Sequence, residues 1–230
     1  MFERPHHRRI ARILDTLDTD VMRASRCFFG GGTAIVLGHG EYRESVDIDL
    51  MTDTVDSYRE LRSLVNTKGI QALFTSPPKL RREVRIDQYR IYCVLDVDDL
   101  PIKFELMHEV RLTLDPPQPQ TDICGVPTLV PHDLAATKLM ANSDRWSADE
   151  VFSRDLIDLA QLLPDGTIPP AAHRKALRAY GNSVERDLKK AVDTLLARDG
   201  RLKRCLVEMK VSVPLAEMTK RLEALHFPAP

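Results

Sequence analysis

The chain has 230 residues, of which 43% are apolar, and a formal net charge of −1. This composition is typical of a globular protein that buries its core in one domain or two small ones. No run of 18 apolar residues predicts a membrane-spanning helix, and residues 1–9 lack the apolar stretch of a signal peptide, so we expect a cytoplasmic protein.

The predicted elements change in character along the chain. Helices are expected over residues 6–25 and 55–68 from their periodicity. Short strands are expected over residues 26–29, 46–51, 89–95 and 102–107. From residue 131 onward almost all of the sequence has helical periodicity. We therefore expect an α+β protein with an N-terminal α/β domain over residues 1–130 and a helical domain over residues 131–230.

Two aspartates interrupt the apolar run that begins at Val46. Side chains alternate along a strand, so Val46, Ile48 and Leu50 should share one face while Asp47 and Asp49 share the other. Two neighbouring carboxylates repel each other and need a compensating cation, for which Mg²⁺ or Mn²⁺ with oxygen ligands is suited. The alternative is an edge strand with a solvated outer face.

Glycines precede this strand. The predicted strand at Phe28 and Phe29 runs into 30-GGGT-33, and a helix-compatible apolar run follows. A glycine turn that opens a helix leaves backbone N–H groups free and allows a phosphate to approach them. The pattern is neither a dinucleotide fingerprint nor a Walker A loop. A phosphate-binding turn before a metal-binding Asp-x-Asp is suited to a nucleoside triphosphate.

These residues resemble the nucleotidyltransferases of the DNA polymerase beta superfold, and specifically the AbiEii/AbiGii toxins of abortive infection. Later motifs agree with the resemblance. The strand 102-IKFELM-107 supplies a third carboxylate at Glu105, and 133-DLAATKLMA-141 matches a toxin helix with its lysine at Lys138. The last motif is 154-RDLIDL-159, which follows Arg145.

The resemblance implies a mixed β-sheet with flanking helices, followed by a helical bundle that contributes to the active-site cleft. It implies a metal-dependent transfer of a nucleotide from an NTP, with metal ligands Asp47, Asp49 and Glu105. Catalytic roles are expected for these three residues and for Lys138 and Asp158. Nucleotide contacts are expected from Gly31, Gly32, Thr33, Arg43, Ser45, Lys138, Arg154 and Asp155.

Each of these residues also has a structural interpretation. Lys138 could extend from a helix face, and Arg154 with Asp158 could form an ordinary surface ion pair. Asp155 could be solvated, and Glu105 could pair with Lys103 or with an arginine of the neighbouring strand. A second acidic segment, 96-DVDD-99, is interpreted as a hairpin turn because it ends a predicted strand and runs into Leu100-Pro101. No glycine turn precedes it.

The acceptor of the nucleotide is the least determined part of the hypothesis. The resemblance implies transfer to an RNA, for example one like tRNA, or to a protein, and it implies a cognate antitoxin of a type IV toxin-antitoxin system. Residues 174–204 carry ten Lys/Arg against four Asp/Glu, which favours RNA. The alternatives are a non-catalytic nucleotide- or RNA-binding module of the same fold and a metal-dependent phosphohydrolase.

Overall fold

The computed structural model describes residues 2–228 and divides into two compact units. The first unit runs to Gly38 and resumes over Ser45–Val130. The second comprises His39–Glu44 and the described residues after Val130. The boundary expected at residue 130 did not include the short segment His39–Glu44, which pairs with a distant part of the chain.

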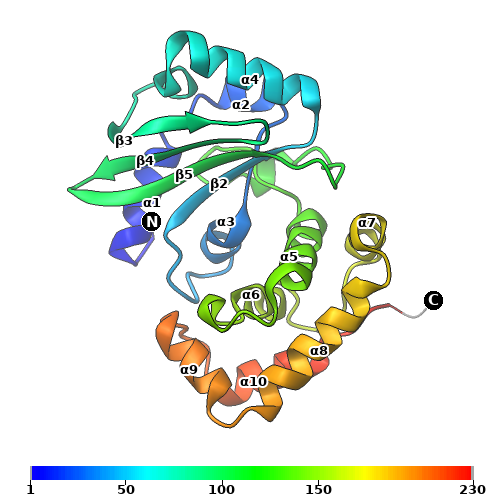
Figure 1. The fold of residues 1–230 in the computed structure, drawn as a ribbon. Helices are drawn as coiled ribbons and strands as arrows, with labels where there is room; N and C mark the ends of the chain where they lie inside the picture. Colours follow the sequence, from blue (N-terminus) through cyan, green and yellow to red (C-terminus); the bar gives the residue numbers. More distant parts are fainter. Residues whose placement is uncertain (1, 229–230) are drawn as a thin grey trace. The chain divides into compact units, whose positions relative to one another are not determined.

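A five-stranded mixed sheet forms the centre of the first unit (Figure 1). The strands are β1 (Phe28–Gly30), β2 (Asp47–Thr52), β3 (Lys79–Ile86), β4 (Arg90–Val97) and β5 (Leu100–His108). Their order in the sheet is β1-β2-β5-β4-β3, with β2 and β5 parallel and the other neighbours antiparallel. The helices of this unit are α1 (Pro5–Leu14), α2 (Thr19–Ala24), α3 (Gly31–Gly38) and α4 (Val55–Lys68), with the 3-10 turns η1 (Ile70–Leu73) and η2 (Pro119–Thr121).

The two faces of the sheet differ in chemistry. On one face Ile48 and Leu50 of β2 and Phe104 of β5 are fully buried. Tyr58 of α4 stacks on His108 at the end of β5, so α4 covers this apolar face. Alternation of side chains along β2 and β5 places the expected carboxylates on the opposite face.

Two expectations for the N-terminal part were wrong in detail. The single helix over residues 6–25 is broken into α1 and α2, because Asp18 caps a new helix by accepting hydrogen bonds from the backbone of Asp20 and Val21. Val46 lies before β2 and is 47% exposed, so it does not share the buried face of Ile48.

Strand β3 was missed. It contains four basic residues and one acidic residue, which is untypical of a strand that is buried on either face. It lies at the edge of the sheet, where charged side chains are common. The turn expected at 96-DVDD-99 is confirmed: Asp98 and Asp99 connect β4 to β5 with φ values of 54° and 60°.

The second unit is helical, as expected (Figure 1). Its helices are α5 (Pro131–Arg145), α6 (Arg154–Leu162), α7 (Pro170–Tyr180), α8 (Ser183–Ala197), α9 (Arg201–Glu208) and α10 (Leu215–Ala224), with the 3-10 turn η3 (Asp149–Val151). The segment His39–Glu44 joins this unit through backbone hydrogen bonds from Ser212 to Tyr42 at 2.7 Å and from Glu44 to Met209 at 3.1 Å. None of the described helices combines the length and the apolar content that crossing a membrane requires.

Candidate active site

The pairing of β2 with β5 brings two of the expected carboxylates next to each other. Asp49 lies opposite Glu105 in the parallel register, and Asp47 lies opposite Lys103. Neighbouring strands are about 4.8 Å apart, so Asp49 and Glu105 form an adjacent pair on one face. We call this surface, formed by Asp47, Asp49 and Glu105, the carboxylate face.

The glycine turn meets the carboxylate face at Asp49. Gly30 pairs with Asp49 across β1 and β2, and Gly31 begins α3 with φ +69°. A Cβ atom at Gly31 would overlap the Asp49 carboxylate. Both the backbone conformation and the close approach therefore require glycine at this position. Gly31, Gly32 and Thr33 form the first turn of α3. Their backbone N–H groups lie at the N-terminal end of the helix, where an anion is favoured.

The hydroxyl groups expected to contact phosphate are used within the unit. Thr33 Oγ1 donates to the carbonyl oxygen of Asp47 at 2.5 Å and lies 2.8 Å from Ser45 Oγ. The backbone N–H of Ser45 donates to the buried ring of His7 at 3.1 Å. These bonds link the first turn of α3 to the start of β2, and so they hold the glycine turn against Asp47.

Glu105 has cationic partners on the sheet. Its carboxylate lies 3.2 Å from the Lys103 ammonium and 3.5 Å from the Arg90 guanidinium. Pairing with Lys103 or with an arginine of the neighbouring strand was the alternative expected for Glu105. Partial burial opposes the charged form of Lys103, but the charges of Glu105, Asp47 and Asp49 outweigh it and raise the pKa of Lys103. Neither cation was singled out as part of the site. The sequence could have indicated Lys103, because side chains alternate along a strand and Lys103 therefore shares the face of Glu105.

The carboxylate face fits a divalent cation in its chemistry. It offers oxygen donors alone, which Mg²⁺ and Mn²⁺ prefer. Among the described residues, the oxygens of Asp47, Asp49 and Glu105 do not all come within 4.8 Å of one another. Binding of one metal ion by all three would therefore require these side chains to move closer together. Three carboxylates that share one face favour such a cation, since Lys103 and Arg90 are shared among several acidic groups.

The helical unit holds a second group of charges. Asp158 of α6 is fully buried and accepts two hydrogen bonds from Arg43, at 2.7 and 2.8 Å, and one from Tyr42. The Lys138 ammonium, on α5, lies 2.6 Å from Asp158 and 2.9 Å from Asp155. Arg145 completes the group with two bonds to Asp155, at 2.7 and 3.0 Å.

We call Arg43, Lys138, Arg145, Asp155 and Asp158 the ionic cluster. Its two carboxylates alternate with three cations, so it holds one excess positive charge. Burial alone would raise the pKa of Asp158, but the charges of Arg43 and Lys138 outweigh burial and lower it below 3.8. For Asp155, Lys138 and Arg145 outweigh burial in the same way and lower its pKa. Burial opposes the charge of Lys138, and the two aspartates raise its pKa.

The ionic cluster revises several structural interpretations. Asp155 is buried and paired, and Asp158 pairs with Arg43, so the expected alternatives of a solvated Asp155 and a surface pair with Arg154 are wrong. Lys138 is only 6% exposed and does not extend along a surface. The Arg154 guanidinium forms no hydrogen bond or ion pair among the residues that the structure describes. The role of Tyr42 was missed, because nothing local in the sequence links it to a residue 116 positions away.

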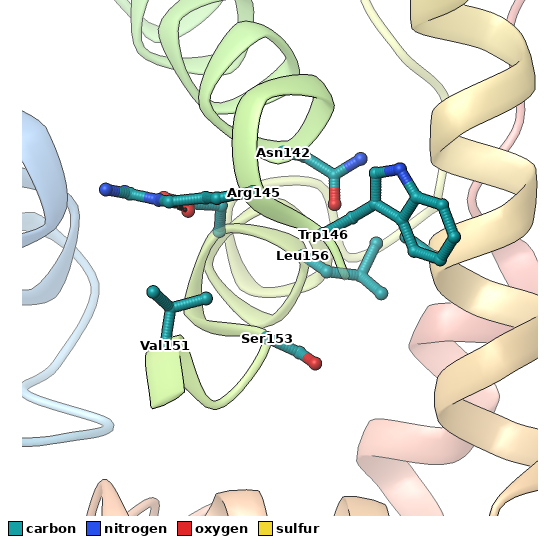
Figure 2. A pocket seen from close by; sticks show the side chains of 8 residues that line it. Asn142, Arg145, Trp146, Val151, Ser153 and Leu156 are labelled. Atoms are coloured by element: carbon teal, nitrogen blue, oxygen red, sulfur yellow. Dashed lines mark hydrogen bonds and ion pairs between the residues drawn. The ribbon is translucent and has the colours of Figure 1, made fainter. Parts of the chain in front are cut away.

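A small pocket lies at the Arg145 end of the ionic cluster (Figure 2). It is lined by Asn142, Arg145, Trp146, Val151, Ser153, Asp155, Leu156 and Ala191. The amide of Asn142 points toward the indole of Trp146, while Arg145 extends to the other side of α5 (Figure 2). The amide nitrogen of Asn142 is buried and finds no hydrogen-bond acceptor within residues 2–228. The rim at Ser153 is held in a left-handed conformation with φ 52°.

Comparisons with solved structures find two chains that are similar to this one. The chain is similar in structure to JHP933 from Helicobacter pylori, with a TM-score of 0.51 and 20% sequence identity over 96% of this chain and 90% of that one. A second H. pylori structure, of a protein proposed to be a nucleotidyltransferase, gives a TM-score of 0.42 and 16% identity over 94% and 89% of the two chains.

A comparison with curated proteins gives no match. The model of one protein family, described as nucleotidyl transferase AbiEii toxin of the type IV toxin-antitoxin system, matches residues 12–225. That match includes the glycine turn, the carboxylate face and the ionic cluster, and it spans most of both units. The chain therefore belongs to the AbiEii family of nucleotidyl transferase toxins.

Proposed function

We propose that this protein is a metal-dependent nucleotidyltransferase that acts in the cytoplasm as the toxin of a type IV toxin-antitoxin system. It transfers a nucleoside monophosphate from an NTP to an RNA or protein acceptor, and pyrophosphate leaves. The observation that carries the proposal is the pairing of Asp49 with Glu105 on one side and with Gly30 on the other. This register supports a triphosphate and a metal site side by side.

The glycine turn is proposed to hold the phosphates of the NTP. The backbone N–H groups of Gly31, Gly32 and Thr33 belong to the first turn of α3, where an anion is favoured. Since Gly31 lies against the Asp49 carboxylate, phosphates bound at the turn would be next to the carboxylate face. Ser45 and the Thr33 hydroxyl support this turn through the bonds that they share.

Asp47, Asp49 and Glu105 are proposed to hold the Mg²⁺ or Mn²⁺. A bound divalent cation supplies positive charge against the negative charge that develops at the α-phosphorus. The oxygen of the acceptor hydroxyl forms the new bond to that phosphorus as the bond to pyrophosphate breaks. Glu105 either completes the metal site or accepts the hydroxyl proton, and Lys103 and Arg90 are the cations next to its carboxylate.

The helical unit is proposed to act on the same nucleotide through the excess positive charge of the ionic cluster. The Lys138 ammonium is proposed to attract the phosphates as a point charge. Asp155 and Asp158 hold its ammonium in one position, and Arg43 holds Asp158 in turn. The Arg154 guanidinium is proposed to contact the nucleotide, since it forms no ion pair or hydrogen bond with the described residues. A cognate antitoxin is the expected antagonist of the toxin.

The test is label transfer from each α-³²P-NTP, with Mg²⁺, total RNA and a protein extract as acceptors. The variant Asp47→Asn/Asp49→Asn removes two charges from the carboxylate face. Asp96→Asn/Asp98→Asn is its matched control, because it removes the same charges from the Asp-x-Asp of the β4–β5 hairpin. We expect label in an acceptor with the wild type and the control, and a loss of at least about 100-fold with Asp47→Asn/Asp49→Asn.

Two outcomes would overturn the proposal. Nucleotide binding without label in any acceptor would favour the non-catalytic module. Release of free nucleotide with no labelled acceptor would favour the phosphohydrolase.

A further inference from the structure

The carboxylate face continues toward the free edge of the sheet. Across the strands, Asp49 of β2 lies opposite Glu105 of β5, Glu105 opposite Tyr92 of β4, and Tyr92 opposite Arg85 of β3. Residues paired in this way have side chains on the same face. Three strand-to-strand spacings separate Arg85 from Asp49, so their backbones lie about 14 Å apart across the sheet.

A second row runs parallel to the first. Asp47 lies opposite Lys103, Lys103 opposite Val94, and Val94 opposite Arg82. Arg82 and Arg85 are an odd number of residues apart, so strict alternation along β3 would place them on opposite faces. The register of β3 shifts between them, and this irregularity turns both toward the face of the carboxylates.

The side chains of these two arginines have no partners among the described residues. Both are exposed, and neither guanidinium forms an ion pair or hydrogen bond in the part of the chain that the structure describes. Two neighbouring arginines do have partners. Arg81 donates to the Asp99 carbonyl at 2.8 Å, and Arg90 pairs with Asp87 and Glu105. Charged residues on an edge strand discourage strand pairing whichever way they point. That purpose does not require both arginines on the carboxylate face.

Tyr92 lies between the arginines and the carboxylates. Its ring is partly exposed, with the Lys103 ammonium 5.8 Å from its centroid. An aromatic side chain on the open face of a sheet can stack a nucleotide base, and adjacent cations can follow the phosphate backbone. A protein side chain that accepts a nucleotide would need neither contact.

We propose that Arg82, Arg85 and Tyr92, here called the acceptor strip, bind the single-stranded end of an RNA acceptor and direct its terminal hydroxyl toward the carboxylate face. This inference rests on the proposed function and selects RNA from its two acceptor classes. Tyr92 stacks a base near the end of the RNA. Arg82 and Arg85 contact phosphates farther from the end.

RNA binding without NTP tests the strip independently of catalysis. The probe is a fluorescein-labelled single-stranded RNA oligomer, titrated with the full chain by fluorescence anisotropy over a series of salt concentrations. For Arg82→Ala/Arg85→Ala we expect weaker binding and a salt slope reduced by about 1.4, since each phosphate contact contributes about 0.7 on single strands. The matched control is Arg59→Ala/Lys68→Ala, which removes two exposed cations from α4 on the other face and should leave the slope unchanged. Equal slopes for wild type and Arg82→Ala/Arg85→Ala would overturn the inference.

Substitutions at Tyr92 separate stacking from packing. Tyr92→Leu keeps apolar bulk on the sheet and should weaken RNA binding about 5- to 150-fold, the range expected for one stacked base. Tyr92→Phe keeps the ring and should bind within about twofold of the wild type. Thermal unfolding of both variants identifies any loss that is due to misfolding. A Tyr92→Leu variant that is folded and binds RNA like the wild type would overturn the stacking role.

The label-transfer assay separates this inference from the proposed function. If label enters protein only, and Arg82→Ala/Arg85→Ala transfers it as well as the wild type does, the acceptor strip is wrong while the nucleotidyltransferase stands. If no acceptor is labelled but RNA binding still depends on the strip, the proposed function is wrong and the strip remains a binding surface. Asp47→Asn/Asp49→Asn should bind the RNA probe at least as tightly as the wild type, because it removes negative charge near the strip.

Discussion

The sheet and the helical unit both gather acidic side chains, but they compensate them differently. In the ionic cluster two buried carboxylates are held by three cations, and every carboxylate oxygen has a partner. On the carboxylate face, the cations next to Glu105 are Lys103 and Arg90, whose side chains are about half exposed. The first arrangement is complete within the protein. The second is the arrangement at which we propose that a metal ion binds.

The largest effect that this comparison predicts is a difference between two isosteric changes. Asp158→Asn leaves Arg43 buried without its counter-charge and removes one of the two carboxylates that hold Lys138, so we expect a loss of about 3–5 kcal/mol in the free energy of unfolding. Asp49→Asn relieves repulsion between neighbouring carboxylates, so we expect its stability to change by less than about 1 kcal/mol in either direction.

Denaturant unfolding measures this difference. The chain has one tryptophan, Trp146, which follows α5 directly and reports on the helical unit by fluorescence, while far-UV circular dichroism reports on both units. Asp193→Asn is the control, because Asp193 forms an exposed pair with Lys189 and its loss should change stability by about 0.5 kcal/mol or less. Equal losses for Asp158→Asn and Asp49→Asn would contradict the distinction between the two groups of carboxylates.

A smaller effect is expected at the glycine turn. Gly31→Ala combines a strained backbone with overlap of its Cβ atom and the Asp49 carboxylate, so we expect a loss of about 2–4 kcal/mol. Gly125→Ala is the matched control in the same unit, since Gly125 has φ +73° but open space around its Cβ position. It should lose about 1–2 kcal/mol from backbone strain alone. Thermal unfolding of the two variants gives the difference, and equal losses would exclude a close contact at Asp49.

The smallest effect concerns pH. The pKa values of Asp155 and Asp158 are lowered below 3.8, so the ionic cluster contributes stability that is fully present above that value and is lost as the pH falls through the folded-state values. Asp155→Asn removes one of these groups. Its stability should therefore fall less steeply than that of the wild type between about pH 5 and about pH 2.5.

Melting temperatures followed through Trp146 fluorescence across this range measure the slope. Asp193→Asn should give a curve parallel to that of the wild type, because its partner is exposed. If the curve for Asp155→Asn were also parallel, the lowered pKa of Asp155 would not contribute to stability.

Much of the site could be predicted because its motifs are local. Alternation along a strand placed Asp47 and Asp49 on one face, and the same rule placed Glu105 beside Lys103. The glycine turn could be located from composition alone, since only glycine provides its backbone geometry. The edge strand β3 could not be predicted from its many charges, because its place at the edge of the sheet is set by pairing with β4.

By itself, the sequence determined the α+β class, the helical second half, the face of each carboxylate and the family resemblance, because these depend on periodicity and on residue types that lie close together in the chain. Only the tertiary structure decided that β5 lies beside β2, that Arg43 pairs with Asp158 across 115 positions, and that Arg82 and Arg85 face the same way. Such contacts join distant segments, and the pair of Arg43 with Asp158 forms where burial makes an unpaired charge costly. The local pattern cannot specify which distant partner meets that need.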